Sequence, residues 1–242
     1  MIGKRFFVFG LFVLLGAAIL FADESNVAKS EVVPLCDAPE TLKRLDPVEP
    51  IWVTADRTAL VMVGKVSLRE GLLEFFACRA GSKEYESIVA IDVKPYLIHA
   101  GLLVIGAKKG HPFRYDPEFI PAEGEKINIV VRWKGDDGEV RELPAGEWVR
   151  NGETGETLST PWVFTGSISG KDQKGNPYYM ANITGELIGV SNFAATILDL
   201  PIESSSENEN LLFEPNTEKI PPPETEVTLV LRRADDKEDE KE

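Results

Sequence analysis

The sequence is poor in the residues from which many catalytic and metal sites are built. It contains two histidines, His99 and His111, and two cysteines, Cys36 and Cys78. So few imidazoles restrict histidine-based mechanisms, and two thiols do not make a disulfide framework. A single bond between Cys36 and Cys78, formed in an oxidising compartment, is the most that we predict.

The common catalytic sequence motifs are also missing. The chain contains neither GxxxxGK[ST] nor GxGxxG, the glycine-rich loops that hold the phosphates of ATP and dinucleotides. It also lacks HExxH, CxxC and GxSxG, which mark zinc proteases, redox proteins and α/β-hydrolases. These absences favour a non-catalytic protein without a cofactor over an enzyme, although a catalytic pair among the many carboxylates stays open.

Positive charge is scarce relative to negative charge. Lysine and arginine total 26 against 40 aspartates and glutamates, which gives a formal net charge of −14. Nucleic acids and anionic membrane surfaces are bound through basic patches, so neither is an expected partner. A partner protein or a component of the cell envelope stays open.

The N-terminus has the order of an export signal. The basic start Met1–Arg5 precedes an apolar run, Phe6–Phe21, and Ala22 is followed at once by acidic residues. The run of 16 residues is shorter than the roughly 20 that a membrane-spanning helix needs. We expect a signal peptide over residues 1–22, cleaved near Ala22, and a periplasmic or extracellular protein; the alternative is an uncleaved N-terminal membrane anchor.

The rest of the chain is predicted to be rich in strands. Residues 23–50 are polar and end in prolines, which predicts a flexible linker, and residues 234–242 are almost entirely charged, which predicts a disordered tail. Between them, short apolar runs alternate with turn residues. The clearest strand has Ile127, Ile129, Val131 and Trp133 on one face.

One helix is expected, over residues 92 to 106. Asp92 is a plausible N-cap, Pro95 suits the first turn, and the residues that follow are apolar nearly all round. Such a helix should be buried against a sheet. The predicted fold is α+β: β-rich, mostly antiparallel sheet with one main buried helix, about 92–106.

Four side chains form a candidate ligand cluster for a transition metal. Cys78, Glu84, Glu86 and His99 fall at the end of one strand, around the next, and on the predicted helix. Thiolate, imidazole and carboxylate ligands suit zinc or iron. Their spacing fits no standard metal motif, and cysteine is often buried without any function, so a structural role stays open.

Several segments together are similar to a known family. They are Val66–Glu74, Cys78, Lys83–Ile88 and Lys94–Leu103, followed by Trp148–Arg150, Trp162–Phe164, Val190–Phe193 and Pro201–Ser205. In these segments the chain resembles the YdjY-domain family of bacterial exported proteins, abundant in planctomycete-like bacteria. The resemblance implies export and a single YdjY-like domain over residues 51–233, but no established activity.

One departure from the family's pattern bears on function. The family's segment usually reads KEHES, whereas this chain reads Lys83-Glu84-Tyr85-Glu86-Ser87, with tyrosine at the histidine position. Within the stretch that carries the resemblance, Arg69, Glu74 and Tyr85 are candidate binding residues. The first hypothesis is an exported, non-catalytic binding or accessory domain. The alternative is a metal-binding or redox protein that uses Cys78 and His99.

Overall fold

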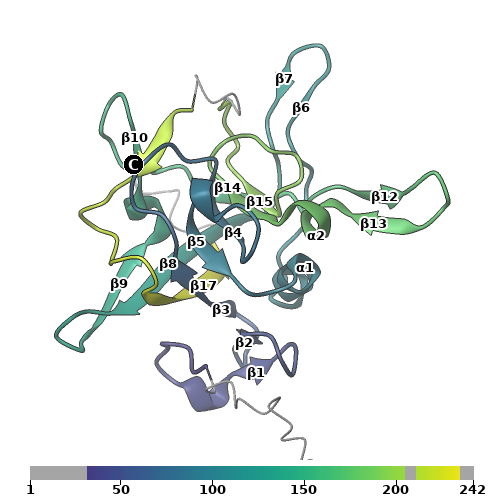
Figure 1. Ribbon diagram of the computed structural model, residues 1–242. Helices are drawn as coiled ribbons and strands as arrows, with labels where there is room; N and C mark the ends of the chain where they lie inside the picture. Colours follow the sequence, from purple (N-terminus) through teal and green to yellow (C-terminus); the bar gives the residue numbers. More distant parts are fainter. Residues whose placement is uncertain (1–31, 205–210, 235–242) are drawn as a thin grey trace, which may run out of the picture. The chain divides into compact units, whose positions relative to one another are not determined.

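Eight strands close into a barrel in the computed structural model, which describes residues 32–204 and 211–234 (Figure 1). The barrel closes because Lys65 and Val66 pair with Ala90 and Val89, which joins the first and last strands of the path. Of the eight pairings between adjacent strands of the barrel, two are parallel and six are antiparallel. In order around the barrel the strands are β3 (Ala59–Val66), β17 (Glu226–Arg233), β8 (Lys126–Lys134), β11 (Trp162–Phe164), β15 (Leu198–Asp199), β14 (Glu186–Gly189), β4 (Phe75–Arg79) and β5 (Ser87–Ile91).

Shorter elements extend the barrel or project from it. One strand pairs with β8, two extend the sheet beyond β3, and three separate two-stranded sheets complete the strands. Two of these small sheets, within residues 114–120 and 169–179, project from the barrel in Figure 1. The added strands are β9 (Val140–Pro144), β1 (Lys43–Arg44), β2 (Ile51–Val53), β6 (Arg114–Tyr115), β7 (Phe119–Ile120), β10 (Val149–Asn151), β16 (Phe213–Pro215), β12 (Ser169–Lys171) and β13 (Pro177–Tyr179). The helices are α1 (Pro95–Val104), α2 (Met180–Thr184) and the 3-10 turns η1 (Pro39–Thr41), η2 (Glu84–Glu86) and η3 (Ala145–Trp148).

The core follows the alternation predicted for the longest strands. On β8, Ile127, Ile129, Val131 and Trp133 are all buried, as their period-2 spacing predicted. Trp133 packs edge-on against Trp148, with ring centroids 5.3 Å apart. These side chains belong to one large apolar cluster that also includes residues of β3, β4, β14 and β17.

The predicted α+β class is wrong, because the sheet closes on itself instead of stacking against a buried helix. Local sequence pattern predicts strands but not the pairing between β3 and β5 that closes the barrel. Among the described residues there are two α-helices, of ten and five residues. A barrel filled by its own inward side chains needs no covering helix layer.

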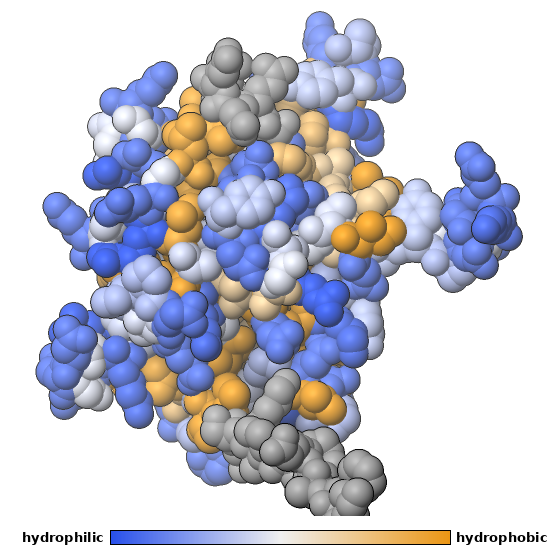
Figure 2. Space-filling model, in the orientation of Figure 1, coloured by the Kyte–Doolittle hydropathy of each residue, from blue (hydrophilic) through white to orange (hydrophobic). Residues whose placement is uncertain are grey.

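Helix α1 forms near the predicted place but is shorter and only half buried. It starts at Pro95, and Lys94, not Asp92, is its N-cap, with no side-chain cap bond. Ile98 and Leu102 face the core, whereas Tyr96 is 45% and Leu103 50% exposed. Figure 2 shows orange hydrophobic areas between blue hydrophilic ones on this side of the molecular surface.

The N-terminal part of the described chain contains regular structure. Residues 32–50, the described part of the predicted linker, contain η1 and strand β1, and β1 pairs with β2 through Lys43–Val53 and Arg44–Trp52. The predicted signal peptide and the predicted tail beyond Ala234 lie outside the described residues. Within residues 32–204 and 211–234, no helix has the length and apolar character to cross a membrane.

Candidate functional site

Cys78 lies on β4 with its side chain fully buried. Burial raises the pKa of its thiol, and hydrogen bonds from the Ser87 and Ser82 side chains and the Lys83 backbone oppose that rise. A buried thiol with a raised pKa carries little thiolate, the form that binds metals and reacts. Cys78 therefore has the surroundings of a core residue.

His99 lies on α1 in a different environment. Its Nδ1 is 3.0 Å from the hydroxyl of Tyr179, and its ring meets those of Phe164 and Tyr179 edge-on. Burial and the nearby charge of Lys109 lower the pKa of the imidazole. A neutral, hydrogen-bonded histidine packed among aromatic rings serves to join α1 to β11 and β13.

The four predicted ligands are therefore not brought together. Glu84 lies close enough to Cys78 to affect its pKa, but the contacts of His99 are with Tyr179, Phe164 and Lys109. In the part of the chain that the structure describes, no three side chains from His, Cys, Asp and Glu are arranged to hold a metal ion. The predicted zinc or iron site has no geometric support.

A different set of charged side chains converges next to Cys78. Lys83 Nζ lies 3.5 Å from Glu74 Oε2, 3.1 Å from Glu86 Oε1 and 3.5 Å from Glu186 Oε1. We call these four residues the carboxylate–lysine cluster. Its members come from the segment before β4, from η2 and its flank, and from β14. The sequence singled out Glu74 and Glu86, each for a separate reason, but not Lys83 or Glu186.

The cluster is held in place by packing beneath the lysine. Lys83 Nζ lies 4.8 Å from the ring centroid of Phe75 and 5.1 Å from that of Phe193. The two rings lie 4.8 Å apart and attract the cation through their electron-rich faces. The backbone oxygen of Glu74 accepts hydrogen bonds from Val190 and Ser191, which fixes β4 against the segment after β14.

Burial and mutual repulsion change the protonation of the cluster. Burial, together with hydrogen bonding and repulsion from Glu86, raises the pKa of Glu74 to about 7. Burial also raises the pKa of Glu186, against the attraction of Lys83. Burial lowers the pKa of Lys83, but the surrounding carboxylates raise it by more. At neutral pH the carboxyl group of Glu74 is therefore near its titration midpoint.

The other two candidate binding residues differ in their roles. Arg69 donates from Nη2 to the backbone oxygen of Thr217 over 2.7 Å, while the Thr217 hydroxyl donates to the backbone oxygen of Arg69. Arg69 therefore joins two segments of the fold. Tyr85 is 72% exposed and stands on η2 between Glu84 and Glu86. Its ring is available at the surface.

A second polar group adjoins the cluster through the segment after β14. Asp199 is fully buried, accepts a hydrogen bond from its neighbour Leu200 N at 2.9 Å, and has an Oδ2 without a partner. Burial raises its pKa well above the ordinary value, although a hydrogen bond with Asn192 opposes this. Asn192 in turn accepts from Ser204 N over 2.7 Å. Sequence reasoning missed Asp199, although the residue stands out as the one acid in the apolar run Ile197–Leu200.

The possible disulfide between Cys36 and Cys78 is not formed in the structure, where both cysteines are free. Cys36 lies beside β8 and β17: Leu35 N bonds to Thr228 on β17, and Asp37 pairs with Arg132 on β8. Cys78 is on β4, which is separated from both strands in the barrel order. The order of strands in the barrel therefore places the two thiols in different surroundings.

Comparisons with known proteins give one result. A family model described as the YdjY domain matches residues 51–232. No curated protein and no solved structure matches the chain. The match includes all four members of the carboxylate–lysine cluster.

Proposed function

The chain belongs to the YdjY-domain family. On that premise we propose that it is an exported, non-catalytic binding domain. The ligand that we propose has a cationic group, which binds at the carboxylate–lysine cluster. The observation that carries the proposal is the convergence of three carboxylates on a single lysine. With every carboxyl group ionised, the cluster has two more negative charges than positive ones. An ammonium or guanidinium group of a ligand would reduce that excess.

The surroundings of the cluster favour the same ligand chemistry. Tyr85 is exposed directly beside Glu86, and Phe193 already packs against the ammonium of Lys83. Aromatic faces attract cations, most strongly where water is partly excluded. A ligand ammonium held between the Tyr85 ring and Glu86 would combine both kinds of attraction.

Binding fits the cluster better than hydrolysis by a carboxylate pair. Glu74 and Glu86 are adjacent, but both are within 3.5 Å of Lys83, and their side chains are only 10% and 16% exposed. A general acid and base must reach the reacting atoms of a substrate. Carboxylates held under a lysine in this way are better placed to attract a cation to the surface than to transfer a proton to a substrate.

Calorimetry of the exported chain with spermidine tests this proposal. Cation binding favours ionised Glu74, whose pKa is about 7, so we expect binding at pH 7 with proton release, seen as a dependence of the heat on the buffer. Glu86→Gln should weaken binding roughly three- to tenfold, and Tyr85→Ala by a smaller factor. Glu153→Gln, at an exposed position of the loop after β10, is the matched control. Absence of binding, or equal affinity in Glu86→Gln, would refute the proposal.

Export has a separate test. The basic start and the apolar run Phe6–Phe21 support it, as does the family resemblance. We expect the mature protein to begin at Asp23, which intact-mass measurement of the chain recovered outside the cytoplasm would check. A full-length chain retained in the membrane fraction would favour the N-terminal anchor instead.

A further inference from the structure

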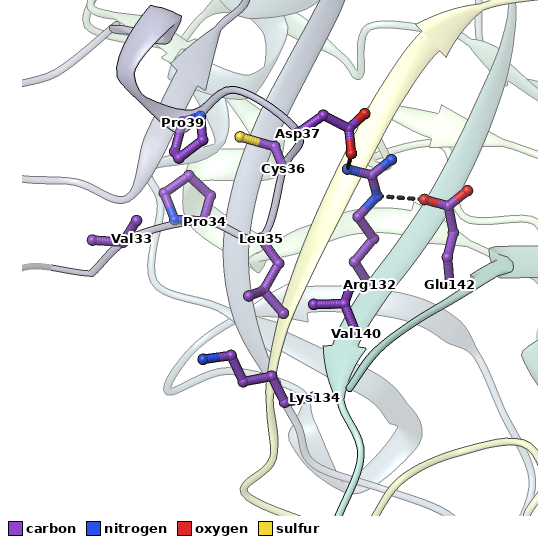
Figure 3. A pocket seen from close by; sticks show the side chains of 10 residues that line it. All are labelled: Val33, Pro34, Leu35, Cys36, Asp37, Pro39, Arg132, Lys134, Val140 and Glu142. Atoms are coloured by element: carbon purple, nitrogen blue, oxygen red, sulfur yellow. Dashed lines mark hydrogen bonds and ion pairs between the residues drawn. The ribbon is translucent and has the colours of Figure 1, made fainter. Parts of the chain in front are cut away.

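A groove lies between the segment before η1 and the strands β8 and β9. Neither strand pairs with β4 or β14, the strands beside the carboxylate–lysine cluster. The volume of the groove is about 460 Å³, which is within the roughly 300–1,000 Å³ of small-molecule sites. The apolar side chains Val33, Leu35 and Val140 form much of its lining (Figure 3). We call it the β9 groove.

The β9 groove is lined by two acidic and two basic side chains, and they are not all paired with one another. Arg132 pairs with Asp37 at 3.2 Å and also with Glu142, so both carboxylates of the lining are already bound to one guanidinium (Figure 3). Lys134 lines the same groove and is exposed, and no ion pair to it is found among the described residues. The groove therefore offers one uncompensated cation next to apolar side chains.

We propose that the β9 groove binds an amphipathic anion, a small molecule with one carboxylate and an apolar body. The carboxylate would pair with Lys134, and the apolar body would lie against Val33, Leu35 and Val140. Charge complementarity selects the head group, because the acids of the groove are bound by Arg132. The exposed apolar surface of Val33 and Val140, 57% and 55% of each residue, would be covered by the ligand body.

This site is independent of the one proposed at the carboxylate–lysine cluster. The two lie on different strands and attract ligands of opposite charge, so each can fail without the other. Substitutions in the β9 groove should leave spermidine binding unchanged.

Competition between an anionic fluorescent dye and dodecanoate tests the proposal on the full exported chain. We expect the wild type to increase the fluorescence of anilinonaphthalene sulfonate and dodecanoate to displace the dye. Lys134→Met should weaken dodecanoate binding roughly five- to tenfold, about the effect of losing one charge-assisted contact. Lys174→Met, an exposed lysine in the turn between β12 and β13, should bind as the wild type does.

A second variant separates binding from folding. Val140→Asp places a negative charge at an exposed position of β9, so it should keep the wild-type urea midpoint while losing dodecanoate binding. Equal dodecanoate affinity in Lys134→Met and the wild type would overturn the proposal. The proposal would also be overturned if the groove were occupied by a second copy of the chain. In that case sedimentation would depend on protein concentration, Val140→Asp would abolish this dependence, and dodecanoate would not compete.

Discussion

Glu74 should make the protein less stable as the pH rises toward neutrality. The pKa of its carboxyl group is about 7 in the folded chain against 4.5 as the ordinary value, chiefly because the group is buried. Between these values the folded chain keeps a proton that the unfolded chain has lost. Its contribution is therefore complete below pH 4.5 and is lost as the pH rises through 7.

The pH dependence can be measured by urea unfolding followed through tryptophan fluorescence. From pH 4.5 to 7.5 we expect Glu74 to account for a fall of roughly 2–3 kcal/mol in the free energy of unfolding. Glu74→Gln should remove that part of the slope and leave the part due to Glu186 and Asp199, whose pKa values are also raised. A slope identical to that of the control Glu153→Gln would contradict the assignment.

Asp199 should tolerate loss of its charge but not loss of its hydrogen-bonding group. Burial raises its pKa well above the ordinary value, which favours the neutral form of the side chain. Asp199→Asn keeps an acceptor for Leu200 N and should change the free energy of unfolding by less than about 1 kcal/mol. Asp199→Ala leaves buried donors unpaired and should cost about 2–3 kcal/mol. Chemical denaturation at pH 7 compares the two, and equal losses would contradict this account.

At the scale of elements, Gly64 is the position at which barrel closure is most sensitive to added volume. A Cβ at Gly64 would lie 2.6 Å from the backbone oxygen of Ala90 on β5, which cannot move without shifting that strand. At Gly101 on α1 the obstacle is the flexible side chain of Leu60, and at Gly152 the nearest atom is 3.7 Å away. We expect alanine to destabilise in the order Gly64, Gly101, Gly152, with about 3 kcal/mol at Gly64 and under about 0.5 at Gly152. Thermal unfolding of the three variants gives the order directly.

The two faces of α1 should respond differently to the same truncation. Leu102 is fully buried, whereas its neighbour Leu103 is 50% exposed. Leu102→Ala should cost about 2–4 kcal/mol through the cavity it leaves, and Leu103→Ala less than about 1 kcal/mol. The free energies of unfolding in urea check this, and similar costs at both positions would mean that the outer face is covered in solution.

This contrast also explains how far the sequence predicts the elements. The period-2 pattern of β8 is a local property, so it located the strand correctly. Helix α1 was placed near its true position by Pro95 and Gly106, but its apolar composition was a poor guide to burial. The burial of a helix depends on what packs against it, and no residue of α1 itself specifies that partner.

At the scale of the whole molecule, the sequence does not reveal which distant residues meet. Glu74 and Glu86 were both singled out, but Glu186 joins them only because β14 pairs with β4, with Glu186 opposite Cys78. Cys78 and His99 are closer in sequence than Cys78 and Glu186, yet they lie in separate environments. Proximity along the chain grouped Cys78 with His99. Strand pairing in the closed barrel instead forms the carboxylate–lysine cluster.

The same topology predicts the behaviour of the two thiols. Cys78 is fully buried on β4, whereas Cys36 is partly exposed beside β8 and β17. A thiol-specific reagent added to the protein under native conditions should therefore titrate one group slowly, because burial raises the pKa of Cys36. In denaturant it should titrate two, and a reductant should leave the thermal midpoint unchanged. Protein with no reactive thiol even when unfolded would contain a disulfide, and β4 would then have to lie elsewhere in the barrel.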